Sequence, residues 1–289
     1  MLVRAATSLF PALVLLLAGL TPQPALAGSA GPVTVPLRVG SYNIRAAEPV
    51  DSFEAGVEAL RPRIDVAGLQ EITGRDKLRY LAATTGWASY SALEQMQNPV
   101  IWDRSKLAFV SGRGALLAKG RYIGDELPKL GDHTKDTYAT IVHLRHILSG
   151  RSLTVINVHL LAGATQAGRP RADRPLMFSE YRDQVRSLDA LVAAESSSGQ
   201  VIVLGDFNVG YAADARWQRK NFPYTRLTKH AMVGMWRDCG TDDNGTHGRQ
   251  YIDQVWTDVP AASCEVGYDI QHSDHYPVVG TYAVDVLPG

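Results

Sequence analysis

The sequence predicts a mixed α/β fold. Nine short apolar segments, rich in Val, Ile and aromatic residues, are bounded by Gly, Pro, Asp or Asn, which is typical of strands. Three longer segments repeat apolar residues at helical spacing; the last of them places Tyr181, Val185 and Leu188 on one face. Some strands are hairpin-spaced and others are joined through helices, so the sheets should be mixed rather than purely parallel.

The expected elements follow one another from residue 37. The expected strands are 37–45, 65–71, 100–102, 107–117, 138–147, 153–160, 201–204, 251–256 and 278–284. The expected helices are 52–60, 76–84 and 177–194. Two segments, 162–175 and 210–226, show no clear pattern and are expected to be long loops, which in compact domains are often functional. Both are basic, with Arg169, Arg171 and Arg174 in the first and Arg216, Arg219 and Lys220 in the second.

The first 27 residues have the pattern of a cleaved secretory signal. Arg4 precedes an apolar run at 9–18, and a small-x-small site ends at Ala27. The run is short for a bilayer span, which takes about 20 apolar residues, although an uncleaved anchor is the alternative. We therefore expect a secreted protein with a signal peptide at 1–27, a short linker at 28–36 and one domain at 37–286.

Composition narrows the class of protein. The chain has 29 basic and 29 acidic residues, 45% hydrophobic residues and two cysteines. This excludes a collagen, a coiled coil, a disulfide-dense mini-protein and a mostly disordered chain. The zero net charge argues against a bulk electrostatic grip on polyanions, but not against a local basic patch. In an oxidising compartment Cys239 and Cys264 should pair, the alternative being two separate buried thiols.

Polar side chains follow the buried strand expected at 201–204. Asp206 and Asn208 come directly after four apolar residues and Gly205. In open α/β sheets, ligands bind at the carboxyl ends of strands. A carboxylate there can orient or deprotonate water, and an amide can donate to a phosphoryl oxygen. By spacing alone, however, an Asp-x-Asn turn is more often only a turn.

The other expected strands also end in polar residues. Alternation places Asn157 and His159 on the same face as Leu153, so an aliphatic face becomes polar toward its end. Each signal is weak alone, but together they predict one site at a sheet edge. Its four carboxylates, two imidazoles and three amides favour metal-assisted attack of water on a phosphate ester. The nine residues are Asn43, Glu71, Asn157, His159, Asp206, Asn208, Asp253, Asp274 and His275.

The ordered motifs resemble those of the endonuclease/exonuclease/phosphatase superfamily, which includes pancreatic-type deoxyribonucleases and bacterial neutral sphingomyelinases. The resemblance spans 37–284 and implies two mixed β-sheets packed as a sandwich, with helices on the outer faces and the site at one edge. It rests on Ser-Tyr-Asn43, Leu-Gln-Glu71, Asn157-Val-His159, Gly-Asp206-Phe-Asn208, Ile-Asp253 and Ser-Asp274-His275-Tyr-Pro.

The resemblance also implies roles for these residues. Glu71 would bind Mg²⁺ or Mn²⁺, with Asn43 and Asp274 in or near the metal shell. The implied catalytic residues are Asp206 to orient the attacking water, Asn208 and His159 to contact phosphoryl oxygens, and Asp253 to pair with His275. His159 is also a candidate general acid. We expect further substrate contacts from Asn157, Tyr138 and Asn98.

The leading functional hypothesis is a secreted, Mg²⁺-dependent phosphodiesterase acting on DNA or RNA. The alternative is a sphingomyelinase-type phospholipase C, which would need exposed aromatic residues to enter a bilayer interface. Trp217, Phe222 and Tyr224 are the candidates for that role. A third hypothesis, a non-catalytic binding module, is disfavoured by the complete set of acids and histidines. We expect a monomer with no obligate protein partner and no transmembrane segment.

Overall fold

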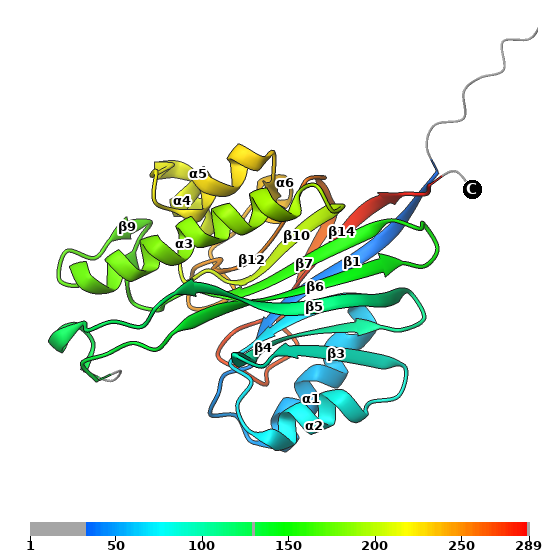
Figure 1. Cartoon of the computed structure of the whole chain (residues 1–289), viewed down its shortest axis with the longest axis horizontal. Helices are drawn as coiled ribbons and strands as arrows, with labels where there is room; N and C mark the ends of the chain where they lie inside the picture. The colour runs from blue at the N-terminus through cyan, green and yellow to red at the C-terminus, as the bar shows by residue number, and fades with distance from the viewer. Residues whose placement is uncertain (1–32, 129–130, 288–289) are drawn as a thin grey trace, which may run out of the picture. The chain divides into compact units, whose positions relative to one another are not determined.

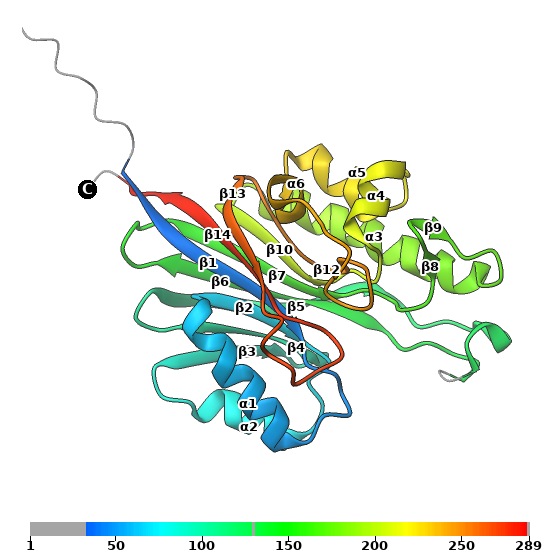
Figure 2. The ribbon, with the colours of Figure 1, turned by 180° about the vertical axis from the view of Figure 1, so that it is seen from behind.

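Two six-stranded mixed sheets form the centre of the molecule, and helices cover their outer faces (Figures 1 and 2). The computed structural model describes residues 33–128 and 131–287. Helices α1 (Val50–Leu60) and α2 (Arg75–Ala83) lie on one side, and α3 (Pro175–Glu195) lies on the other. The expected α/β sandwich of two mixed sheets between helical layers is confirmed. The expected signal peptide at 1–27 lies outside the described residues.

The first sheet brings the ends of two parallel strands to one edge. Its order is β13 (Ala261–Val266), β14 (Val278–Asp285), β1 (Thr34–Asn43), β2 (Val66–Gln70), β4 (Gln95–Asp103) and β3 (Trp87–Ala92). Strands β1 and β2 are parallel, with Asn43 paired with Gln70. The residues that follow both strands therefore emerge side by side at their carboxyl ends.

The second sheet places three polar residues in one row. Its order is β11 (Val233–Gly234), β12 (Asp253–Thr257), β10 (Gln200–Asp206), β7 (Ser152–His159), β6 (Thr137–His146) and β5 (Leu107–Ala118). Strand β10 pairs in parallel with β7, which sets Asp206 opposite His159. It pairs antiparallel with β12, which sets Asp206 opposite Asp253.

Close strand packing explains the glycine before Asp206. The four residues 201–204 are buried, as expected of a strand covered on both faces. Gly205 has φ 143°, and a Cβ on it would overlap the carbonyl oxygen of Val158 on β7. Gly205 therefore belongs to the strand and lets β10 continue to Asp206 beside its neighbour.

The structure corrects several expected boundaries. Residues 34–36 were assigned to the linker but belong to β1, where they pair with β14. The strand expected from Tyr251 begins at Asp253, because the carbonyls of Tyr251 and Ile252 accept hydrogen bonds from the chain that follows β10. Strands β3 and β13, which are rich in Ser and Ala, were not predicted.

Both segments expected to be loops contain regular structure. The segment at 162–175 holds a small hairpin of β8 (Thr165–Gln166) and β9 (Arg169–Pro170). The segment at 210–226 holds α4 (Tyr211–Trp217) and most of α5 (Pro223–Leu227). These elements are too short to show a hydrophobic period in the sequence. Short 3₁₀ turns complete the fold at Arg61–Arg63, Gly124–Glu126 and Thr228–His230.

A disulfide joins Cys239, at the end of α6 (Met235–Cys239), to Cys264 on β13, with a Cα–Cα distance of 6.0 Å. The expected pairing is therefore present in the structure. In the described part of the chain, no helix combines the length and apolarity needed to cross a membrane.

Candidate active site

Polar residues from both sheets meet at the carboxyl ends of β1, β2, β7 and β10. The amide nitrogen of Asn43 donates to Glu71 Oε1 at 3.0 Å, within the first sheet, and to Asp206 Oδ2 at 3.1 Å, in the second. One buried amide thus holds two carboxylates from different sheets together. This direct link defines the centre of the candidate site.

The chain leaves its strands here in unusual backbone conformations. Arg45 and Glu71 have φ of 26° and 63°, a region that residues other than Gly, Asn and Asp rarely adopt, and Asn208, with φ 49°, is of a type that tolerates it. Glu71 Oε2 accepts the backbone N–H of Ala46 at 2.8 Å, and Asp206 Oδ1 accepts that of Asn208 at 2.8 Å. Such strain persists where surrounding contacts over-determine it, and it clusters at functional sites.

His159 faces both carboxylates. Its Nε2 lies 3.5 Å from Asp206 Oδ2 and 4.0 Å from Glu71 Oε1. Burial and the charge of Asp253 raise the pKa of Asp206, although the two histidines at the site oppose that shift. Burial would also raise the pKa of Glu71, but the hydrogen bonds from Ala46 and Asn43 hold that pKa below its ordinary value.

His275 is held as a cation. Its Nδ1 lies 2.9 Å from Asp253 Oδ2, which also accepts the hydroxyl of Thr246 at 2.7 Å. Burial alone would lower the pKa of His275, but the charge and hydrogen bond of Asp253, together with the charge of Asp206, raise that pKa to about 10. Its Nε2 lies 3.9 Å from Asp206 Oδ2. The expected pairing of Asp253 with His275 is thus present in the structure.

Two residues expected to contact the substrate are fully buried. Asn157 is fully buried and spans the two sheets: its amide donates to the carbonyls of Leu69 and Pro99, both at 2.9 Å, and accepts from Gln70 at 2.7 Å. Asn98 is also fully buried, and its side-chain atoms have no hydrogen-bond partner among the described residues. Both lie beneath the site, where Asn157 ties the layers together.

Other expected residues do lie at this edge. Extending the β6–β7 register places Tyr138 opposite His159, so both side chains share one face. Asn208 donates to the carbonyl of Leu160 at 2.9 Å, and its amide has no second acceptor among the described residues. Asp274 is half exposed, and its Oδ2 lies 3.8 Å from Arg45 Nε.

Sequence reasoning missed two residues at the site. Thr246 orients Asp253, as described above. The ring of His247 stacks on that of His275, with centroids 4.3 Å apart, and its Nδ1 lies 3.0 Å from the carbonyl oxygen of Asp274. The sequence feature that could have indicated these two residues is a Thr-His pair between Gly245 and Gly248, shortly before Ile-Asp253.

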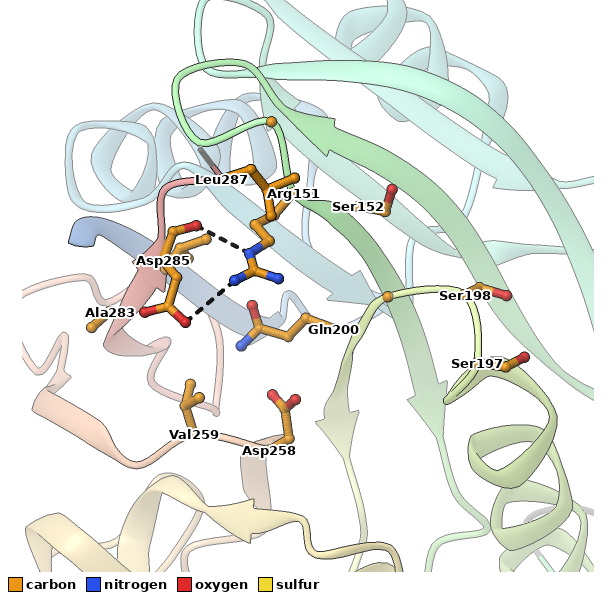
Figure 3. Close-up of a pocket in the computed structure, with 13 residues that line it drawn as sticks. Arg151, Ser152, Ser197, Ser198, Gln200, Asp258, Val259, Ala283, Asp285 and Leu287 are labelled. Carbon is orange, nitrogen blue, oxygen red and sulfur yellow. Dashed lines mark hydrogen bonds and ion pairs between the residues drawn. The ribbon is translucent and has the colours of Figure 1, made fainter. Parts of the chain in front are cut away.

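One hollow adjoins this site and a second lies away from it. The adjoining pocket, of about 600 Å³, is lined by residues next to the site, including Ile72, Leu161 and Thr137. The second, of about 490 Å³, lies at the amino ends of β7 and β10, where Arg151 pairs with Asp285 (Figure 3). None of the nine candidate residues lines it in the described structure, so the chemistry belongs to the opposite sheet edge.

Comparison with known families decides the identity of the fold. A sequence profile of the endonuclease/exonuclease/phosphatase family matches residues 40–275, which include all nine candidate residues. The chain belongs to this family. Endonuclease/exonuclease/phosphatase enzymes are metal-dependent phosphoric ester hydrolases, and this protein is one of them.

Solved structures of the family share the fold at low sequence identity. A family protein from Bacteroides thetaiotaomicron is similar at a TM-score of 0.62 and 15% identity, over 88% of this chain and 99% of that one. Zebrafish TDP2, complexed with a single-stranded DNA product, gives 0.62 and 15%, over 86% and 98%. The catalytic domain of human Nocturnin gives 0.58 and 16%, over 87% and 97%. No curated protein matches the chain in sequence.

The donor set fits the divalent metal on which this family depends. Side-chain atoms of Asp206, Asp253 and His275 lie within 4.8 Å of one another, as do those of His247, Asp274 and His275. A protonated His275 cannot ligate a metal, so the carboxylates are the ligands that these groups offer. Asp253 Oδ1 is buried without a hydrogen-bond partner among the described residues. Facing carboxylates repel each other, so a bound cation would relieve this cluster. Ligation of the metal by Glu71, Asn43 and Asp274 stays a prediction.

Proposed function

We propose that this chain is a secreted, Mg²⁺-dependent phosphodiesterase of nuclease type. The observation that carries the proposal is the amide of Asn43 bridging Glu71 and Asp206, with His159 and His275 facing the same Asp206 carboxylate. The carboxylates of Glu71 and Asp206, with the imidazoles of His159 and His275 beside them, suit attack of water on a phosphodiester. The disulfide supports export, because such bonds persist in oxidising compartments.

The residues of the chain divide the chemistry among them. Asp206, with its raised pKa, would take the proton of the attacking water. His275, which stays protonated at neutral pH, would place positive charge beside the phosphoryl group. His159 would contact a phosphoryl oxygen or protonate the leaving oxygen, and Asn208 would donate its free amide hydrogen.

Glu71 offers carboxylate oxygens of the kind that Mg²⁺ prefers, and Asp206 lies beside it. When bound, the ion would stabilise the negative charge that builds up on the phosphoryl group. Asn43 would hold the carboxylates of Glu71 and Asp206 side by side. This assignment predicts that the carboxylates depend on Asn43 for position even before any metal binds.

Burial of the aromatic residues weighs against the phospholipase alternative. Phe222 is buried, and Tyr224 packs edge-on against Trp256 at 5.9 Å. Only Trp217 of the three candidate aromatics is exposed, at 39%, and arginines lie over its ring. A membrane anchor would instead present several bare apolar side chains.

One observation favours a sphingomyelinase-type phospholipase C as the second candidate. The pocket beside the site is lined by Leu93 and Met96, which are 88% and 48% exposed. An apolar substrate group next to the scissile phosphate could occupy it. We place the nuclease proposal first because the basic segments 162–175 and 210–226 offer positive charge that a nucleic acid needs and a lipid substrate does not.

A substrate panel tests the proposal. Mature protein would be assayed on plasmid DNA, single-stranded DNA, RNA, sphingomyelin vesicles and bis(4-nitrophenyl) phosphate, with Mg²⁺ or with EDTA. We expect nucleic acid cleavage that EDTA abolishes and that His159→Ala or Asp206→Asn reduces at least 100-fold, roughly the contribution of one acid–base group. Asp258→Asn, an exposed carboxylate at the opposite sheet edge, is the matched control and should retain full activity.

The outcomes separate the hypotheses. Release of phosphocholine from the vesicles with intact nucleic acid would overturn the nuclease assignment in favour of the phospholipase. Absence of hydrolysis of every phosphoester with metal present would contradict catalysis itself. For export, sequencing of the amino terminus of protein secreted from the natural full-length chain should begin near residue 28; an uncut Met1 would contradict the signal peptide.

A further inference from the structure

Three arginines gather around one exposed indole beside the candidate site. The guanidinium carbons of Arg169, Arg216 and Arg219 lie 4.2, 5.3 and 5.6 Å from the ring centroid of Trp217. Arg169 comes from β9, whereas the other three residues belong to α4 or directly follow it. Residues from two separate elements thus form one basic cluster, which we call the Trp217 cluster.

The Trp217 cluster lacks the counter-charges that neighbouring arginines have. In the same segments, Arg171 pairs with Asp173 at 2.6 Å, and Arg226 pairs with Asp189 at 2.8 Å. Within residues 33–128 and 131–287, the three arginines of the cluster have no ion pair or side-chain hydrogen bond. A cation–π contact at an exposed ring is weak, while the like charges of the three arginines repel one another. An anionic ligand would remove that repulsion.

Short contacts fix the cluster next to the candidate active site. Thr165 on β8 donates to the backbone carbonyl of Asn208 at 2.8 Å. At the other end of the hairpin, a Cβ on Gly168 would lie 2.8 Å from the carbonyl carbon of Ala213, so the turn packs directly on α4. Gln166 pairs with Arg169 across the hairpin. At strand spacings, the backbone of Arg169 is therefore roughly 10 Å from that of Asn208. Figure 2 shows the hairpin beside α4.

We propose that the Trp217 cluster binds backbone phosphates of a nucleic acid strand, a few nucleotides from the phosphate that reacts at Asp206. This inference rests on the nuclease function proposed above and names the surface that selects a polymer over a small phosphodiester. Trp217 is a positioning residue, because the guanidinium groups of all three arginines lie against its ring. Arginine is suited to this contact because its fork matches the geometry of a phosphate.

The positive charge of the Trp217 cluster explains how a chain with no net charge could bind a polyanion. Phosphate contacts position a nucleic acid without reading its sequence, and three arginines can supply them on a protein with no net charge. An anionic bilayer would also attract these arginines. However, a single tryptophan covered by guanidinium groups offers little apolar surface for insertion. A flexible polyanionic strand is the occupant that the cluster fits.

Salt-dependent binding tests the cluster without requiring catalysis. A fluorescein-labelled 20-nucleotide oligo(dT) would be titrated by fluorescence anisotropy with full-length mature protein carrying Asp206→Asn, at several NaCl concentrations. Adding Arg169→Ala/Arg216→Ala should reduce the slope of log K against log[salt] by about 1.4, at about 0.7 per lost contact to a single strand. The matched control is Arg104→Ala/Arg145→Ala, two exposed arginines without ion pairs among the described residues, at the opposite strand ends. It should leave the slope unchanged.

Kinetics with two substrates separate this inference from the proposed function. In the active protein, Arg169→Ala/Arg216→Ala should raise KM for single-stranded DNA and leave turnover of bis(4-nitrophenyl) phosphate unchanged. Equal salt slopes for the two double variants would overturn the cluster even if the protein cleaves DNA. Conversely, a lowered slope together with uncut nucleic acid would support the cluster and contradict the nuclease. Loss of binding to phosphatidylserine vesicles with unchanged oligo(dT) binding would overturn the assignment to nucleic acid.

Discussion

Replacing the buried carboxylate of Asp214 by an amide should stabilise the protein at alkaline pH. Asp214 lies in α4, 2% exposed, and its Oδ2 accepts the backbone N–H of Tyr224 at 2.8 Å. Its Oδ1 has no hydrogen-bond partner among the described residues. Burial raises the pKa of Asp214 from 3.8 to about 7, and the single hydrogen bond from Tyr224 offsets only part of that shift.

The sign of the effect follows from proton linkage. Between pH 4 and pH 7 the folded protein keeps a proton on Asp214 that the unfolded chain has already released. The free energy of unfolding therefore falls as pH rises through this window. The full shift corresponds to about 4 kcal/mol at 1.36 kcal/mol per pKa unit, and between about 2 and 3 kcal/mol of it develops from pH 5 to pH 8. Asp214→Asn keeps the acceptor for Tyr224 and removes the titration.

Urea unfolding of wild type and Asp214→Asn, followed by tryptophan fluorescence at both pH values, measures this difference. The gain in unfolding free energy from the substitution should be larger at pH 8 than at pH 5 by about 2 to 3 kcal/mol. Because other groups titrate equally in both proteins, their contributions cancel. Asp243→Asn, at an exposed position, is the control and should show no such difference. Equal pH dependence of wild type and Asp214→Asn would refute the reasoning.

Two further predictions concern how the layers are held together. Asn157→Ala would remove three hydrogen bonds to buried groups of the first sheet, so it should lower the free energy of unfolding by about 3 kcal/mol or more in urea titrations. A loss below 1 kcal/mol would contradict the tie between the sheets. Cys239→Ser/Cys264→Ser removes the disulfide, which links residues 25 apart. This should lower the free energy of unfolding by about 3.5 kcal/mol and lower Tm by roughly 10 °C in calorimetry. An unchanged Tm would show that the bridge does not constrain the unfolded chain.

The sequence predicted the site residues better than their roles. Strand-end polarity located Glu71, His159 and Asp206 correctly at one edge, because the ends of parallel strands must meet there. The same pattern placed Asn157 with them, since strand alternation gives the face of a residue but not its depth. In the folded protein that face is covered by the first sheet up to Asn157 and opens only at His159.

The basic loops show a second limit of sequence reasoning. Their charges were visible in the sequence, but their pairing was not. Arg169 and Arg171 are two positions apart, yet one lies over Trp217 and the other binds Asp173. The contact of Arg169 with Trp217 joins segments about 50 residues apart, which no local pattern records, whereas Arg171 pairs with a residue two positions away.

By itself, the sequence determined the alternation of strands and helices, the family motifs and the kind of chemistry. These depend on hydrophobic period and residue type, which are local properties. Only the tertiary structure decided that Asn43 links Glu71 to Asp206 across two sheets, and that Asp253 and Thr246 hold His275. Those contacts join residues that the chain keeps far apart, and they arise because the sheets pack face to face.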